Sequence, residues 1–161
     1  MVLLMALCAP ALLRAQRATG DAAVVSSHFT TIGVAIGTPG SVNATLAWTD
    51  RAWTLRGSAG LGGGGRSGAQ SALAWRVIRG EQLAVGPALV VGAWRNYDIV
   101  DPMATVPTRS TAYIGLAGDA YLDGFRVQIG VGQSGGAHSG RVLIAQAGWE
   151  WQVGNRPERR Q

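Results

Sequence analysis

The segment 146–153, QAGWEWQV, alternates small or polar residues with apolar ones and places two tryptophans around a single glutamate. In an extended strand successive side chains point to opposite faces, so Trp149 and Trp151 share one face while Glu150 lies on the other. A soluble β-sheet protein would turn the tryptophan face toward a protein core, whereas a membrane barrel would turn it toward lipid. The fold therefore depends on which face of this strand points outward.

The composition is that of one apolar and lightly charged domain. The chain has 161 residues, of which 47% are hydrophobic and 14% charged, compared with roughly 25% charged residues in an average soluble domain. The net charge of +5 comes from arginine alone. These arginines are scattered except near the C-terminus, so we expect no nucleic-acid partner. The single cysteine, Cys8, lies in an apolar leader, and a closed barrel needs no disulfide.

The N-terminus has the pattern of an export signal. Residues 1–15, MVLLMALCAPALLRA, contain an apolar run over 2–13 that is too short to span a bilayer. We expect a signal peptide over 1–15, cleaved at about residues 15–18, then a folded domain over 26–153 and a polar basic tail over 154–161. A buried N-terminal helix is the alternative interpretation of the apolar run.

A period of two dominates the rest of the chain and predicts an all-β fold with eight strands. The expected strands are 28–37, 41–49, 51–61, 71–78, 82–94, 111–122, 125–133 and 141–153. Strands of about ten residues with alternating hydrophobicity are typical of a barrel.

Short connections predict how neighbouring strands pair. The dipeptide at 123–124, Asp-Gly, is a strong hairpin signal, because glycine accepts the positive φ of a type I′ turn. We expect a second two-residue loop at 50–51 and a tight turn at 79–81. The pairings that these two-residue loops predict are Tyr121 with Arg126 and Trp48 with Trp53.

The remaining connections, 38–40, 62–69, 96–110 and 134–140, alternate with the tight turns along the chain, and three of the four are long. In an up-and-down barrel, alternate connections lie at the same end. One end should therefore carry tight turns and the other longer loops, as in bacterial outer-membrane barrels. The longer loops are where we expect specific contacts with a surface ligand, which the sequence does not identify.

Aromatic residues of the apolar faces gather near the tight-turn end. An indole has an apolar body and one hydrogen-bond donor, and such residues form girdles at membrane–water interfaces. The expected girdle is Trp48, Trp53, Trp75, Phe125, Trp149 and Trp151. Trp94, Tyr97 and Tyr113 are expected at the opposite end.

Taken together, residues 26–153 resemble a small eight-stranded bacterial outer-membrane barrel of the OmpA/OmpX type. The resemblance implies an antiparallel up-and-down transmembrane β-barrel, contact with membrane lipid and localisation in the bacterial outer membrane. The segment 146–153 also resembles the C-terminal insertion signal of that class, which implies transient recognition by the barrel-assembly machinery. The matching residues are Gln146, Gly148, Trp151 and Val153. The chain departs from the pattern by continuing as GNRPERRQ, whereas the family usually ends at an aromatic residue.

Eight strands enclose an interior just wide enough for side chains to fill it, so we expect no large pore. Charged residues on the face away from lipid should pair inside the lumen, because charges removed from water need partners. The expected ion network is Arg56, Arg76, Asp119, Arg126 and Glu150. A narrow gated conduit is the alternative interpretation of this network.

No pattern in the sequence predicts a catalytic, cofactor or metal site. His138 and Ser139 would need Glu150 for a triad, but a strand places that glutamate about 25 Å away or more. Asp98 and Asp101 form at most a weak cation site, and the glycine-rich segment 60–65 lacks the Lys-Ser/Thr of a phosphate-binding loop. We therefore expect a structural or surface-interaction role and no enzyme activity. The alternatives are a secreted soluble β-barrel that binds an apolar ligand and a lipid-acting outer-membrane enzyme.

Overall fold

The computed structural model describes residues 28–79, 83–96, 109–137 and 139–153. The expected signal peptide and basic tail, Tyr97, His138, Asp98 and Asp101 lie outside these residues. The described strands are β1 (His28–Gly37), β2 (Val42–Asp50), β3 (Trp53–Gly62), β4 (Arg66–Trp75), β5 (Ile78–Arg79), β6 (Leu83–Asn96), β7 (Arg109–Leu122), β8 (Phe125–Gly136) and β9 (Gly140–Val153). The described residues contain no α-helix, only the 3₁₀ turn η1 (Gly63–Gly65).

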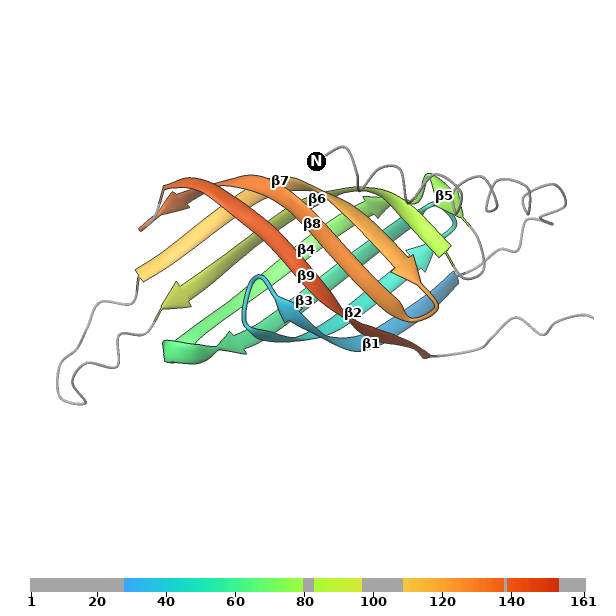
Figure 1. The fold of residues 1–161 in the computed structure, drawn as a ribbon, viewed down its shortest axis with the longest axis horizontal. Helices are drawn as coiled ribbons and strands as arrows, with labels where there is room; N and C mark the ends of the chain where they lie inside the picture. Colours follow the sequence, from blue (N-terminus) through green and yellow to red (C-terminus); the bar gives the residue numbers. More distant parts are fainter. Residues whose placement is uncertain (1–27, 80–82, 97–108, 138, 154–161) are drawn as a thin grey trace, which may run out of the picture.

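Eight antiparallel strands close into a barrel, as the sequence predicts. Each strand pairs with its neighbours in chain order, and the ring is closed by the pairing of β1 with β9. The short β5 is not a wall strand of its own, because it continues the line of β4 along β6. Figure 1 shows the strands crossing the long axis obliquely, with both described chain ends at the right-hand end.

The register shows how the barrel closes. Starting at Thr30 and crossing every strand through directly paired residues, the path reaches Leu143 on β9, which the β9–β1 register would place opposite Gly40. One circuit is therefore displaced by about ten residues, and such a stagger requires strands tilted by about 35–45°. The path after Thr30 crosses only large apolar side chains, all exposed: Trp48, Leu55, Leu73, Leu89, Leu116, Val131 and Leu143.

The expected strand 71–78 is interrupted by a bulge. β4 begins earlier, at Arg66, and pairs with β6 only as far as Ala74 opposite Ala88, while β5 resumes one residue out of register. Pro87 of β6 lies opposite this break and has no N–H to offer β4. A β-bulge adds one residue to a strand, so the ladder resumes beyond the position where Pro87 cannot donate a hydrogen bond.

One predicted hairpin is confirmed and the other is wrong. Tyr121 does pair with Arg126, across a turn in which Asp123 and Gly124 both have positive φ. Trp48, however, lies opposite Leu55, not opposite Trp53. The chain reverses at residues 51–52, where Arg51 adopts a φ of 52°, and Asp50 remains in the ladder. A displacement of two positions leaves every side chain on its expected face.

The expected long connections at 62–69 and 134–140 are also wrong. The first is reduced to η1, because the small residues that follow it pair with β6 from Arg66 onward. The second is reduced to 137–139, because β8 and β9 extend toward each other. Glycine and serine are typical of loops, but in a barrel wall they can continue the ladder. The turn residues 80–82 and most of the connection 96–110 lie outside the described residues.

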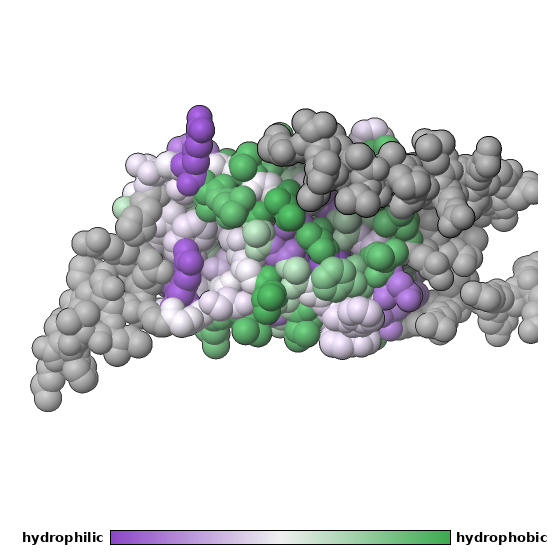
Figure 2. Space-filling view, in the orientation of Figure 1, coloured by the Kyte–Doolittle hydropathy of each residue, from purple (hydrophilic) through white to green (hydrophobic). Residues whose placement is uncertain are grey.

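Side chains segregate sharply between the two faces of the wall. The outer face carries large exposed apolar residues on every long strand, whereas the inner face carries buried arginine, acid, amide and hydroxyl side chains. Figure 2 shows the apolar residues gathered over the middle of the barrel, with hydrophilic residues toward the ends. The distribution is the reverse of that in a soluble barrel.

Gly148 tests the close approach of β9 and β1. A Cβ at this inward-facing position would overlap the Val34 carbonyl oxygen and the Ala35 side chain. We expect Gly148→Ala to lower the free energy of unfolding by about 1–3 kcal/mol, the usual cost of overpacking. Gly57→Ala is the control, because a Cβ there meets nothing within 4 Å. Urea unfolding in detergent micelles, followed by circular dichroism, measures both; equal stability of the two variants would contradict this packing.

Candidate functional site

Glu150 lies at the centre of a buried ionic cluster. Arg56 on β3 donates from Nε to Glu150 Oε1 at 2.7 Å and from Nη2 to Oε2 at 3.2 Å, which is the two-point geometry that favours arginine–carboxylate pairs. The same guanidinium reaches Asp119 on β7, with Nη1 3.3 Å from both carboxylate oxygens. Thr31 on β1 donates its hydroxyl to Glu150 Oε2 at 2.9 Å. Glu150 thus joins β9 to β3 and β1, and Arg56 extends the connection to β7.

Asp119 is shared between two arginines. Arg126 on β8 donates from Nε to Asp119 Oδ1 at 2.7 Å, while its Nη1 donates to Gln146 Oε1 on β9. All of these side chains are nearly inaccessible to solvent. Two guanidinium groups therefore face two carboxylates, and the cluster carries no net charge in its ionised form.

Arg76 lies toward the tight-turn end of the expected network and interacts electrostatically with Arg56, Asp119 and Glu150. Its Nη2 donates to the Thr49 hydroxyl at 3.2 Å, and its guanidinium lies 5.3 Å from the centre of the Phe29 ring. Its position just after the β4 bulge moves it toward the tight-turn end. The structure thus brings Arg56, Asp119, Arg126 and Glu150 into direct contact and gives Arg76 different hydrogen-bonding and ring contacts.

Uncharged polar residues form a second layer that sequence reasoning missed. Gln70 receives a hydrogen bond from the Tyr113 hydroxyl at 2.6 Å and donates to Gln128 at 2.8 Å. Gln146 donates from Nε2 to the Thr38 carbonyl at 2.9 Å. Their inward positions follow from the alternation, so the face of each was predictable. Their partners were not, because they come from strands far apart in sequence.

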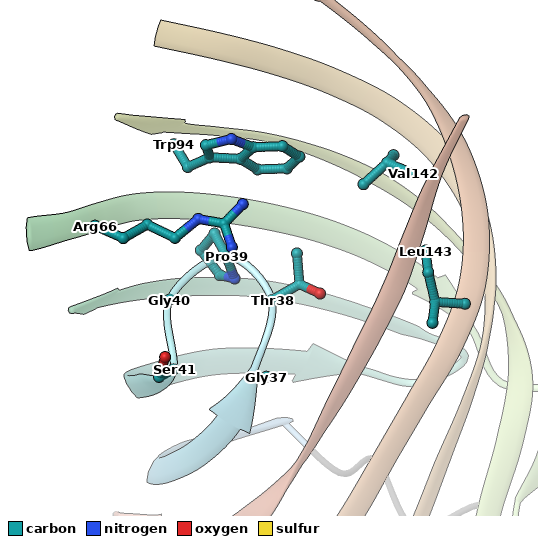
Figure 3. A pocket seen from close by; sticks show the side chains of 9 residues that line it. All are labelled: Gly37, Thr38, Pro39, Gly40, Ser41, Arg66, Trp94, Val142 and Leu143. Carbon is teal, nitrogen blue, oxygen red and sulfur yellow. The ribbon is translucent and has the colours of Figure 1, made fainter. Parts of the chain in front are cut away.

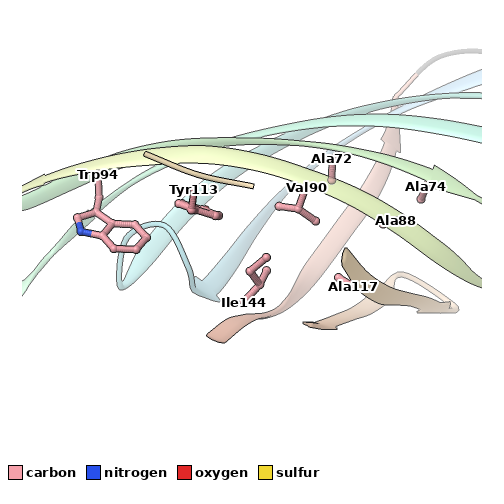
Figure 4. Close-up of a cluster of buried hydrophobic side chains, with 8 residues drawn as sticks. All are labelled: Ala72, Ala74, Ala88, Val90, Trp94, Tyr113, Ala117 and Ile144. Carbon is pink, nitrogen blue, oxygen red and sulfur yellow. The ribbon is translucent and has the colours of Figure 1, made fainter. Parts of the chain in front are cut away.

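Apolar side chains close the interior toward the other end. Val90 on β6 and Ile144 on β9 are completely buried, and Trp94 and Tyr113 pack beside them with ring centres 5.0 Å apart. Figure 4 shows these side chains directed into the space enclosed by the strands. Trp94 and Tyr113 lie toward the end opposite the aromatic girdle, as expected, but their side chains are buried inside the lumen. The ionic cluster near the tight-turn end and the apolar side chains toward the opposite end together fill the interior.

The expected girdle residues all point outward near the tight-turn end. Trp53 and Trp75 lie directly opposite each other and stack with ring centres 6.2 Å apart, and Phe125 and Trp149 form a tilted pair at 6.3 Å. The six aromatic side chains are 43–51% exposed: Trp48, Trp53, Trp75, Phe125, Trp149 and Trp151. This arrangement makes a partial aromatic band over β2, β3, β4, β8 and β9.

The residues expected to form the insertion signal divide between the two faces. Gln146 and Gly148 are on the inner side, where Gln146 contacts Arg126 and Gly148 permits the approach of β1. Trp151 and Val153 are exposed on the outer side. Each therefore has a place in the barrel, and recognition during insertion remains a prediction.

The described residues offer few groups for catalysis. Ser139 is exposed, and Glu150 is held within the ionic cluster. His28 Nδ1 lies 3.1 Å from Asp50 Oδ1 on the outer side of the tight-turn end, without a nucleophile in that contact. Within the described ranges, no group of three or more His, Cys, Asp or Glu side chains is arranged to hold a metal ion.

No helix in the described part of the chain is long and apolar enough to cross a membrane. Comparison with known proteins identifies no matching family model, no matching curated protein and no matching solved structure.

Glu150→Gln tests the ionic cluster. The substitution leaves Arg56 and Arg126 to share the single charge of Asp119 in a buried site, and breaking one partner of a buried pair costs about 3–5 kcal/mol. We expect a loss of that size in the free energy of unfolding in micelles. Asp50→Asn is the matched control, because its pair with His28 is partly exposed and such pairs contribute about 0–1 kcal/mol.

Replacing Arg56 and Glu150 together by leucine should recover much of the stability lost by Glu150→Gln, because it removes both buried charges. An unchanged unfolding free energy for Glu150→Gln would show that the cluster does not stabilise the barrel.

Proposed function

We propose that the chain is an outer-membrane β-barrel whose filled interior makes it a structural or surface-interaction protein, not a large pore. The observation that carries the proposal is the orientation of three consecutive residues on β9. Glu150 is 4% exposed and paired with Arg56, whereas Trp149 and Trp151 are 45% and 51% exposed. A soluble barrel that binds an apolar ligand requires these two faces to be exchanged.

The belt of exposed apolar side chains supports a lipid environment. It continues through every long strand of the barrel and includes leucine, isoleucine and valine side chains that are more than half exposed. Monomeric soluble proteins rarely expose a contiguous apolar surface of more than a few hundred Å². A hydrocarbon solvent around the belt would remove the cost of exposing it, and the closed ladder leaves few unpaired backbone groups in the wall.

The aromatic band supports an orientation in the membrane. Indole rings at the edge of an apolar belt match the interfacial girdles of membrane barrels. The band would then mark the interface at the tight-turn end, which is the periplasmic end in bacterial barrels. The opposite end would face outward, and its longest connection is the segment between β6 and β7, residues 97–108.

The filled interior supports a role other than bulk transport. The ionic cluster and the apolar side chains beyond it occupy an eight-stranded lumen that is narrow from the start. Export through the N-terminal signal and recognition of the 146–153 strand by the assembly machinery complete the proposal. Contacts with a partner would be made by the outward end.

Leu116→Arg tests whether the belt lies in lipid. Leu116 is 67% exposed in the middle of β7, and an arginine at the bilayer midplane of a barrel costs about 2–4 kcal/mol. We expect a loss of this size in unfolding from lipid vesicles. Leu61 is 73% exposed and lies at the end of β3 that is farther from the turn at 51–52. Leu61→Arg should therefore lower the free energy of unfolding by only about 0–1 kcal/mol.

If both arginine variants stay within about 0.5 kcal/mol of the parent, the belt is a water-exposed surface, because such changes are usually neutral there. That result would contradict the proposed membrane location.

A further inference from the structure

The barrel wall is shorter along the barrel axis at the β1–β2 hairpin than at the longest strands. β1 and β2 contain 10 and 9 residues, whereas β6, β7 and β9 contain 14 each. Figure 1 shows the β1–β2 connection turning back well before the left-hand end that β3, β4, β8 and β9 approach. The β1–β9 ladder ends at Gly37 opposite Gln146, although β9 begins at Gly140. A part of β9 therefore has no neighbouring strand on one side.

The connection after β1 turns into the barrel and does not extend the wall. Pro39 and Gly40 are buried. The Asn43 side chain holds this turn, accepting a hydrogen bond from the Gly40 amide at 3.0 Å and donating to the Gly37 carbonyl at 2.9 Å. The result is an opening in the wall, which we call the β1–β9 notch.

The notch is a cavity of about 390 Å³, within the range of small-molecule sites. The segment 37–41 forms one side, Val142 and Leu143 of β9 form the other, and Arg66 and Trp94 lie behind them. Figure 3 shows the Arg66 guanidinium between the Trp94 indole and Pro39, facing the space in front of β9. Because Leu143 is an outward residue, 66% exposed, the cavity reaches the outer surface of the barrel.

The exposed edge of β9 supplies backbone hydrogen-bonding groups to the notch. Thr38 donates its amide to the Ala145 carbonyl at 2.7 Å and accepts the Ala145 amide on its hydroxyl at 3.1 Å. Alternate residues of an antiparallel strand direct their backbone groups to the same side, so Leu143 and Arg141 direct theirs toward the notch. No strand of the described residues pairs with them there.

The charge around the notch is positive. Arg66 lies over the Trp94 ring at 4.7 Å, and Arg141 is exposed on the outer face two residues from Leu143. Neither arginine forms an ion pair with a carboxylate of the described residues, and none of the described acidic residues lines the cavity. A guanidinium that lines the same cavity as the backbone N–H groups of a strand edge is a favourable partner for a phosphate.

The position of the notch identifies the source of that phosphate. On the outer face of β9 the apolar belt ends at Leu143 and is followed by Arg141. In the proposed membrane orientation this step is the boundary between acyl chains and headgroups. We propose that the β1–β9 notch binds the phosphate of an anionic membrane lipid, held by Arg66 and the free edge of β9, with its acyl chains on the outer face beside Leu143. This inference rests on the proposed function.

Lipid retention by the full chain, measured by native mass spectrometry from detergent micelles, tests the proposal. Phosphatidylglycerol should be retained in preference to phosphatidylcholine. Arg66→Gln should weaken phosphatidylglycerol binding about fivefold, the equivalent of about 1 kcal/mol for one arginine near an anionic lipid surface. Arg95→Gln, which removes an exposed arginine from the outer face of β6, should leave binding unchanged. Equal effects of these two variants, or equal retention of the two lipids, would overturn the site.

A second pair of variants keeps the test independent of Arg66. Leu143→Glu places a carboxylate at the notch, and Leu116→Glu places one at an equally exposed outward position away from it. Only the first should lower phosphatidylglycerol retention. Inorganic phosphate is the probe for a free anion. If it displaces phosphatidylglycerol at equal concentration, the acyl chains add nothing and the lipid assignment is wrong.

Tryptophan fluorescence separates this inference from the proposed function. In a variant that retains only Trp151, brominated acyl chains in vesicles should quench the fluorescence if the barrel spans the membrane. In a variant that retains only Trp94, phosphatidylglycerol should change the fluorescence by drawing the Arg66 guanidinium from the ring. Quenching of Trp151 without a response of Trp94 would reject the notch alone. Unquenched Trp151 would reject the membrane barrel as well.

Discussion

The pairing of Glu150 with Arg56 inside the barrel determines how the rest of the molecule faces its surroundings. A strand turns alternate side chains to opposite faces, and directly paired residues of neighbouring strands share a face. Once Glu150 points inward, Trp149 and Trp151 must point outward. The register then transmits the same choice to every other strand. The ionic cluster thus accounts for the exposed apolar belt, the outward aromatic band and the inward layer of glutamines.

The interior of the barrel is filled by side chains without being a purely apolar core. Near the tight-turn end, two arginines form ion pairs with two carboxylates, and near the other end Val90, Ile144 and two aromatic rings occupy the space. The apolar part lies next to the inward turn at residues 38–40. That turn shortens the wall and opens the notch. The apolar side chains that fill the lumen therefore lie next to the turn that leaves the edge of β9 exposed.

The sequence predicted the features that depend on alternation. The strand count, the faces of the aromatic residues and the turn at 123–124 all follow from a period of two or from a dipeptide with one preferred conformation. The contacts of Arg76 with Thr49 and Phe29 were not predictable, because Arg76 follows a bulge opposite Pro87. The pairing of Trp48 with Trp53 failed because a two-residue displacement conserves both faces, so hydrophobicity cannot distinguish the registers.

Other features depend on contacts between distant strands. The glycine- and serine-rich segments at 62–69 and 134–140 resemble loops when considered alone, yet pairing with β6, β7 and β8 makes much of them strand. The inward packing of Trp94 on Tyr113 and the notch beside β9 arise in the same way. Their residues come together only when the barrel closes, with β1 shorter than its neighbour.

Spin-label accessibility along β9 in lipid vesicles tests the central claim most directly. Nitroxides placed singly at residues 143–151 should alternate, with outward positions such as 149 and 151 accessible to oxygen and protected from a water-soluble nickel reagent. Inward positions such as 146 and 150 should be inaccessible to both. Access of the nickel reagent to positions 149 and 151, equal to that of a free label in water, would contradict the account, because the tryptophan face would then be turned toward water.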